Sequence, residues 1–179
     1  MGPRTAVIAL GSVLMTDDAV GAHVLRRLES EHELPSDIEL LDLGTPGPEL
    51  AHRIEGLDAV IFIDTIRITD AVPGEIHLLR REEILRGHQS LRLSPHDPSL
   101  RGALLAADLL GQAPAEVLLV GVVPADTHLG IGLTPAVQAA LPAAVVTVAA
   151  ELDRLGCGAP RRETPQPVEL WWEKSQDQA

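Results

Sequence analysis

Two adjacent carboxylates, Asp17 and Asp18, occupy the segment LGSVLMTDDAVG, directly after an apolar run that breaks at Gly11. Acidic side chains at a turn from a strand into a helix can bind a metal ion or activate a water molecule. A structural role is the alternative: Thr16 would cap the helix, and the two carboxylates would stabilise its positive end by about 0.3 to 1 kcal/mol per charge. On these residues alone both interpretations stay open.

Three more polar side chains stand where apolar segments end or a helix begins. Asp42 ends an apolar run in DLGTPG, Asp64 ends another in IFIDTI, and His96 precedes a helix in SPHDPSL. Each has a structural alternative, because the two acids can form or cap turns and a lone histidine is more often simply hydrogen-bonded. Two carboxylates and an imidazole at one sheet edge would form a mixed oxygen and nitrogen set for a divalent transition metal, with positions left open for substrate.

The alternation of apolar runs with amphipathic segments predicts the elements that must position these side chains. We expect strands at 5–10, 38–43, 57–63, 75–79 (at an edge) and 116–123, and helices at 17–30, 48–54, 82–86, 99–110 and 134–155, the last bent or restarted at Pro142.

This order predicts a three-layer α/β/α fold with a mostly parallel twisted sheet, phosphorylase/hydrolase-like, over residues 1–156. Residues 157–179 would form a C-terminal tail that is partly docked or flexible. In such folds ligands bind outside the carboxyl ends of the strands. We therefore expect the acids and His96 to meet at that edge.

The composition limits the partners and the compartment. Of 179 residues, 45% are hydrophobic and 2% aromatic, so the core is aliphatic and a stacking platform for nucleic-acid bases is not expected. A formal net charge of -12 disfavours nucleic acid and anionic membranes as partners. With no signal peptide and no apolar run of about 18 residues, we expect a cytoplasmic protein. The single cysteine, Cys157, excludes an intrachain disulfide.

Several other chemistries lack the residues they need. The first turn offers Gly11 alone, which is too few glycines for a dinucleotide-binding fingerprint. The chain has no GxSxG elbow and no Walker loop. Ser12 and Ser94 have no identifiable activating base, and Cys157 lies beyond the last long helix. A hydrolase that attacks a small molecule with its own nucleophile is therefore disfavoured.

Seven short segments, in order over about residues 5–156, resemble the maturation endopeptidases of [NiFe] hydrogenases: GSVLMTDDAVG, DLGTPGPEL, VIFIDTI, PGEIHLL, SPHDPSL, VLLVGVVP and GLTPAV. In that family the second acid of the pair, an Asp at the end of the third strand and a His ahead of a later helix bind nickel. The resemblance therefore implies that Asp18, Asp64 and His96 bind nickel that is supplied with, or shared with, the substrate. It also implies the reaction, which removes a short C-terminal peptide from the [NiFe] hydrogenase large-subunit precursor after nickel insertion.

This chain departs from the family pattern at two places. The family usually has Gly-x-Gly-Asn before the acidic pair. In this chain Ala9 replaces the first glycine, Gly11 keeps the second, and Ser12 replaces the asparagine. Asp18 stands where Glu is frequent, and its shorter side chain withdraws the carboxylate by about 1.5 Å, one carbon–carbon bond. Both acids are compatible with metal binding.

The resemblance leaves the activation of water open. Either the metal polarises the scissile carbonyl or a bound water, or Asp17 or Asp42 acts as general base, so the hydrolysis is metal-assisted or of aspartic type. Gly44 and Thr45 would shape the loop that receives the peptide. The same metal ligands would also serve a non-catalytic alternative, a nickel-sensing checkpoint or binding protein for the hydrogenase large subunit.

Overall fold

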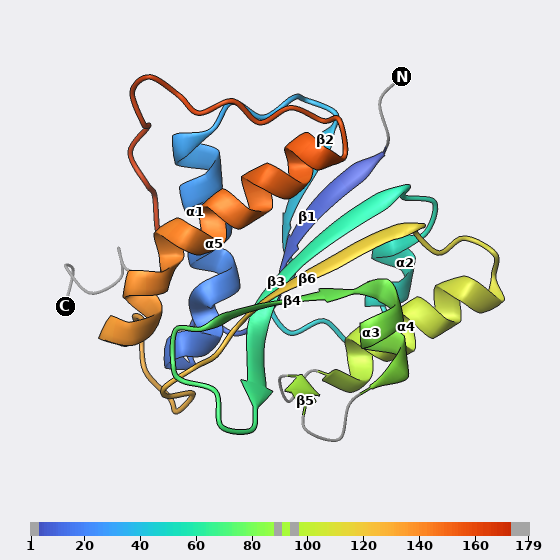
Figure 1. The fold of residues 1–179 in the computed structure, drawn as a ribbon, viewed down its shortest axis with the longest axis horizontal. Coiled ribbons are helices and arrows are strands. Elements are labelled where there is room, and N and C mark those ends of the chain that lie inside the picture. The colour runs from blue at the N-terminus through green and yellow to red at the C-terminus, as the bar shows by residue number, and fades with distance from the viewer. Residues whose placement is uncertain (1–3, 88–90, 94–96, 173–179) are drawn as a thin grey trace.

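The computed structural model describes residues 4–87, 91–93 and 97–172, and Figure 1 draws their arrangement. The strands are β1 (Thr5–Ala9), β2 (Ile38–Asp42), β3 (Ala59–Ile68), β4 (Ile76–Arg80), β5 (Leu91–Leu93) and β6 (Glu116–Val122). The helices are the 3-10 helix η1 (Thr16–Ala19), α1 (Val20–Glu31), α2 (Leu50–Ile54), α3 (Arg81–Arg86), α4 (Asp97–Leu109) and α5 (Pro135–Arg154).

The strands form one sheet in the order β2-β1-β3-β6-β4, with β5 paired to β3 away from this path. β1 pairs in parallel with β2 and β3, and β3 pairs in parallel with β6, so four strands bring their carboxyl ends to one edge. β4 pairs antiparallel with β6 at the outside of the sheet, where we expected an edge strand. The predicted α/β fold with a mostly parallel sheet is confirmed.

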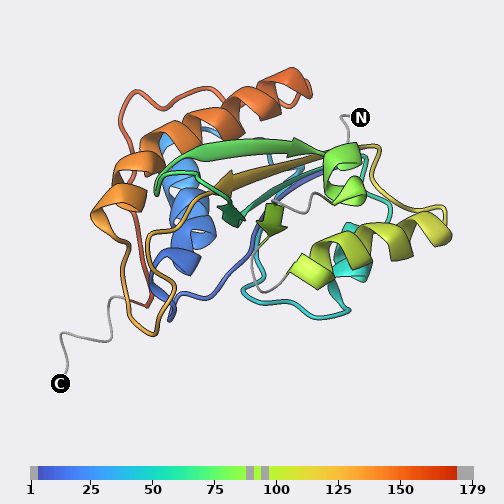
Figure 2. The ribbon, with the colours of Figure 1, turned by 60° about the horizontal axis from the view of Figure 1, so that its bottom comes forward.

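The helices cover both faces of this sheet, as Figure 2 shows. α1 and α5 pack on one face through side chains such as Val24 and Val145. α2, α3 and α4 cover the other face through Leu50, Ile84 and Leu104. Each of these buried aliphatic side chains contributes about 1.5 to 3 kcal/mol by leaving water, so the aliphatic composition is sufficient for the two cores.

β3 is longer than the sequence predicted, and Asp64 lies inside it rather than at its end. The pairing of β1 with β3 stops at Ile63, but β6 stays paired as far as Thr65. β5 then pairs antiparallel with residues 66–68. This second partner extends the strand, and the three residues of β5 are too short a pattern to be recognised in a sequence.

α5 is one continuous helix through Pro142, so a restart at that proline does not occur. By length and composition this helix of twenty residues could cross a membrane, but half of an apolar 18-residue stretch within it is buried inside the protein. A helix that is apolar on most sides is usual for the core of an α/β domain.

The tail that follows α5 lies along α1 over its described residues, 157–172. The backbone N–H groups of Arg162 and Gln166 donate to the carbonyls of Glu31 and Ser30, at 2.7 and 2.9 Å. These carbonyls belong to the last turn of α1, which has no further helical donors to satisfy them. The tail ends at Trp172, whose side chain is buried.

Glu151 of α5 ties the edge strand to the helix layer. It is 7% exposed and accepts hydrogen bonds from Arg80 at 2.9 Å and from Arg154 at 2.8 Å. Burial alone would raise the pKa of this carboxyl, but the hydrogen bonds and positive charges of the two arginines outweigh it, and the pKa is lowered. A lowered pKa stabilises the folded state above the unfolded-state pKa of glutamate, and this stabilisation is lost as the pH falls through the folded-state value.

We therefore expect Glu151→Gln to lower the free energy of unfolding by about 1 to 3 kcal/mol at pH 7, because the arginines lose a charged acceptor. The difference from wild type should shrink as the pH falls below the ordinary pKa of glutamate and through the lowered pKa of Glu151, because Glu151 then takes up a proton. Urea denaturation at pH 7 and at an acidic pH measures this. Glu29→Gln, in a pair on the surface of α1, is the matched control and should change stability by about 0.5 kcal/mol or less. An equal loss at both pH values would contradict the assignment.

Candidate active site

The carboxyl ends of the first three parallel strands are joined by backbone hydrogen bonds. After β1, Leu10 N–H donates to the Ile63 carbonyl of β3 at 2.9 Å, and Gly11 N–H donates to the Gly44 carbonyl after β2 at 2.8 Å. Leu43 N–H donates back to the Ala9 carbonyl at 3.1 Å. The loops that carry the acidic residues are therefore fixed to one another before any side chain is considered.

The turn from β1 into η1 depends on Gly11. Its φ is +101°, and a Cβ atom at this position would lie 2.0 Å from the backbone oxygen of Asp18. Gly21 is as closely packed, since its Cβ would lie 2.6 Å from the carbonyl oxygens of Leu10 and Ile63. The two glycines let the start of α1 lie directly on the ends of β1 and β3, which brings the acidic pair to the sheet edge.

Asp18 and Asp64, the two predicted carboxylate ligands, are linked through Thr65. The hydroxyl of Thr65 donates to Asp18 Oδ1 at 3.0 Å, and the backbone N–H of Thr65 donates to Asp64 Oδ1 at 2.7 Å. Ser12 N–H donates to the other oxygen of Asp18 at 2.8 Å. Asp18 and Asp64 are 4% and 5% exposed, so both carboxylates are buried at the sheet edge.

Side chains along β3 alternate between the two faces of the sheet, so Asp64 and Thr65 point to opposite faces. Ile63 packs in the core under α1 and α5, whereas Phe62 and Ile66 pack in the core under α2, α3 and α4. Successive side chains of a strand point to opposite faces, so Asp64 is directed to the side of α4 and Thr65 to the side of α1. Sequence reasoning missed Thr65, because a threonine in a buried strand is an ordinary strand former.

The third predicted metal ligand, His96, lies outside the described residues. Among the residues that the structure describes, no group of three or more His, Cys, Asp or Glu side chains could hold a metal ion. The set of Asp18, Asp64 and His96 therefore stays a prediction. The two described members supply carboxylate oxygens from adjacent elements, which is a donor type that divalent transition metals accept.

Asp17 has a different environment from its neighbour. It is fully buried, and its carboxylate accepts four hydrogen bonds from the loop between β6 and α5. The backbone N–H groups of Ala125 and Asp126 donate to Oδ2 at 2.8 and 3.0 Å, while Thr134 donates its N–H at 2.7 Å and its hydroxyl at 2.9 Å. Oδ2 accepts three of these bonds and Oδ1 accepts one, so this loop takes up most of the acceptor sites of the carboxylate.

Thr16 does not cap the helix, and the expected cap is wrong. No side chain caps the start of η1. The hydroxyl of Thr16 instead donates to the carbonyls of Asp126 and His128, at 3.2 and 2.8 Å, and its φ is +46°. The loop at 126–130 lies against the turn, where Thr16 N–H also donates to the Gly130 carbonyl at 2.9 Å. This tertiary contact outweighs the local preference of threonine for a cap.

Asp42, Gly44 and Thr45 lie together in a cleft of about 570 Å³ beside the turn that carries the acidic pair. Asp42 is exposed, and the side-chain hydrogen bond that it accepts from Gly44 N–H is long at 3.4 Å. Asp17 is not part of the lining, so the structure separates these two predicted catalytic residues. The described lining is Gly11, Ser12, Val13, Leu14, Arg26, Asp42, Leu43, Gly44, Thr45 and Trp171.

The contact between Gly11 and Asp18 predicts a large cost for a single methyl group. Gly11→Ala should lower the free energy of unfolding by about 1 to 3 kcal/mol more than Gly132→Ala. Gly132 is the matched control, because its φ is +93° but nothing lies within 4 Å of the place a Cβ would take. Urea denaturation of both variants separates the strain of a left-handed backbone from the clash. Equal losses would show that the close approach is relieved without cost.

The four bonds to Asp17 predict that its amide analogue cannot satisfy the same donors. Asp17→Asn puts an N–H₂ group against a buried donor, so we expect the free energy of unfolding to fall by about 1 to 3 kcal/mol. Asp42→Asn, at an exposed position, should change it by about 0.5 kcal/mol or less. Thermal unfolding monitored by circular dichroism measures both. Equal stability of the two variants would overturn the structural role of Asp17.

Comparison with known proteins agrees with the resemblance seen in the sequence. The family model described as hydrogenase maturation protease (HycI) matches residues 22–151. The hydrogenase 2 maturation protease of Escherichia coli (strain K12) is 36% identical over 160 residues, which cover 89% of this chain and 97% of that protein.

Solved structures give the same result. The hydrogenase maturating endopeptidase HybD from E. coli superposes with a TM-score of 0.81 and 34% identity, covering 89% of this chain and 98% of that one. The [NiFe] hydrogenase maturation protease HybD from Thermococcus kodakarensis has a TM-score of 0.68 and 29% identity, covering 83% of this chain and 98% of that one. The chain belongs to the hydrogenase maturation protease family.

Proposed function

We propose that this endopeptidase removes the C-terminal extension of a [NiFe] hydrogenase large-subunit precursor, and that it recognises the nickel carried by that precursor. The observation that carries the proposal is that Asp18 and Asp64 each accept a hydrogen bond from Thr65 at the sheet edge, and that Asp18 is also bonded to Ser12, which lines an open cleft. The names of its relatives, hydrogenase 2 maturation protease and [NiFe] hydrogenase maturation protease, support the substrate class.

In this proposal the nickel is part of the substrate, and Asp18, Asp64 and His96 bind it. The hydroxyl of Thr65 and the N–H of Ser12 fix the carboxylate of Asp18 in one orientation. Holding the precursor by its metal places the scissile amide at a constant position in the cleft, and such orientation is a large catalytic contribution. The metal would also polarise the carbonyl or a bound water.

The two remaining acids have separate roles. Asp17 accepts four hydrogen bonds from the loop between β6 and α5, so we assign it the role of positioning that loop. Asp42 is exposed in the cleft with one long hydrogen bond, and it is the carboxylate available to act as general base on a water. Gly44 and Thr45, on the same loop, line the path of the peptide.

The experiment mixes the purified chain with the nickel-loaded and the nickel-free precursor of its hydrogenase large subunit and follows the intact mass of each. We expect loss of a C-terminal peptide from the nickel-loaded precursor only. Asp18→Asn should lower kcat/KM by about 100-fold or more, because the loss of a ligand exceeds the 10- to 100-fold effect of an outer partner. Asp37→Asn is the control, since Asp37 is exposed and directly precedes β2, at the opposite edge of the sheet.

Two outcomes would contradict this proposal. Cleavage of the nickel-free precursor at the same rate would remove the role of the metal in recognition. Binding of the nickel-loaded precursor without any loss of mass would indicate the checkpoint protein instead of the protease.

A further inference from the structure

The tail contributes one wall of the cleft that holds Asp42, Gly44 and Thr45. Trp171 lines this cleft together with Leu14 and Leu43 from the loops after β1 and β2. The side chain of Trp171 is 60% exposed and that of Leu14 is 52% exposed. Phe62 and Trp172, the other Phe, Tyr or Trp residues of the chain, are buried, so Trp171 is the exposed member of this group.

Trp171 is held in place by contacts that reach back to α1. Its ring meets the ring of Trp172 edge to face, with centroids 5.6 Å apart. Trp172 is 3% exposed and meets His23 of α1 edge to face at 5.2 Å. Edge-to-face pairs of this kind are favourable, by about 0.5 to 1.5 kcal/mol beyond the area they bury. Trp171 is therefore a fixed wall of the cleft, since it rests on a buried partner.

The cleft that Trp171 lines lies next to the buried carboxylate of Asp18. Gly11 and Ser12 belong to its lining, and Ser12 N–H donates to Asp18 Oδ2 at 2.8 Å. A peptide lying in the cleft would run over the turn that holds Asp18. Trp171 would therefore contact the same segment of the substrate that lies over Asp18.

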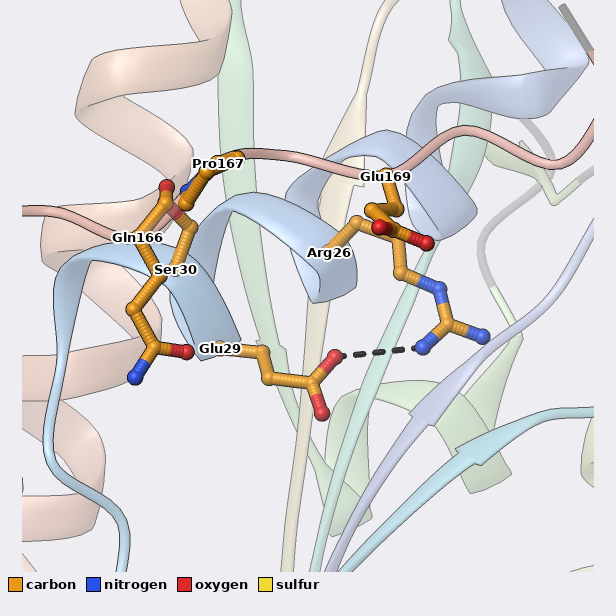
Figure 3. Close-up of a pocket in the computed structure, with 6 residues that line it drawn as sticks. All are labelled: Arg26, Glu29, Ser30, Gln166, Pro167 and Glu169. Atoms are coloured by element: carbon orange, nitrogen blue, oxygen red, sulfur yellow. Dashed lines mark hydrogen bonds and ion pairs between the residues drawn. The ribbon is translucent and has the colours of Figure 1, made fainter. Parts of the chain in front are cut away.

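A second hollow continues the cleft along the tail, and Arg26 lines both. Figure 3 shows this hollow, with Arg26 and Glu29 on α1 joined at 3.1 Å and the tail passing beside them. The guanidinium charge is thus already matched by an acid. Asp42 gives the first cleft a negative charge, and the whole chain carries a net charge of -12, so an acidic substrate side chain would be repelled there.

We propose that Trp171, with Leu14 and Leu43, forms an apolar subsite that binds an aliphatic side chain of the precursor beside the bond to be cut. This inference rests on the proposed function. Rigid aromatic side chains that stand exposed among aliphatic neighbours are the usual anchors of protein recognition. The matched family model ends at residue 151, so the subsite uses a residue outside the region that this model describes.

The test compares precursor processing by wild type, Trp171→Ala, Trp171→Phe and Val168→Ala. Trp171→Ala should raise KM by about ten-fold or more and leave kcat within about two-fold, as expected when binding alone is lost. Trp171→Phe should keep most of the affinity. Val168→Ala is the control, because Val168 is an exposed apolar residue of the same tail that is not part of this cleft. A KM for Trp171→Ala equal to that of Val168→Ala would overturn the subsite.

A second measurement uses the unchanged protein and does not depend on how the variants fold. Hydroxyl-radical footprinting should modify Trp171 in the free chain and protect it at saturating nickel-loaded precursor, while Leu109, which is 89% exposed on α4, stays equally modified. Cleavage of the precursor without protection of Trp171 would overturn the subsite and leave the proposed function intact. A wild-type chain that does not cut the precursor would instead contradict the proposed function itself.

Discussion

A backbone carbonyl and a missing side chain fix the geometry on which the whole site depends. The Asp18 carbonyl lies so close to Gly11 that a Cβ there would be 2.0 Å away, and the φ of +101° at Gly11 is one that other residues rarely adopt. This contact folds the chain back between β1 and η1. It allows Ser12 N–H to reach the Asp18 carboxylate and lets the start of α1 rest on the ends of β1 and β3, where Gly21 leaves room.

The same tight turn separates two neighbouring acids that look equivalent in the sequence. Because η1 is a 3-10 helix of four residues, Asp17 and Asp18 leave it in different directions. Asp17 binds four donors of the loop between β6 and α5, and Asp18 binds Thr65 of β3. One carboxylate therefore organises the surroundings, and the other is held at the edge of the sheet where chemistry is possible.

Local patterns were sufficient for most of the helices and strands, though not for β5, and for the edge at which the acids gather. Apolar runs predicted the parallel strands to within a few residues, except β3, whose extension depends on pairing with β5. The seven ordered segments predicted the family. The sequence did not predict that Thr65 binds both Asp18 and Asp64. That contact depends on the register of β1 with β3, which places the start of η1 beside Thr65. The sequence also offered Asp17 and Asp42 as equivalent candidates for the general base, whereas Asp17 is buried and Asp42 is exposed.

The site consists of two parts with different tolerance to change. The inner part, Asp17, Asp18, Asp64 and Thr65, is buried and interlocked, so a substitution there leaves a partner without its hydrogen bond at a cost of about 1 to 3 kcal/mol. The outer part comes from loops after the strands and from the tail, where Trp171 is exposed. Exposed loop residues can vary without disturbing the buried bonds, so the rim of the cleft can adapt to a particular precursor while the inner carboxylates keep their positions.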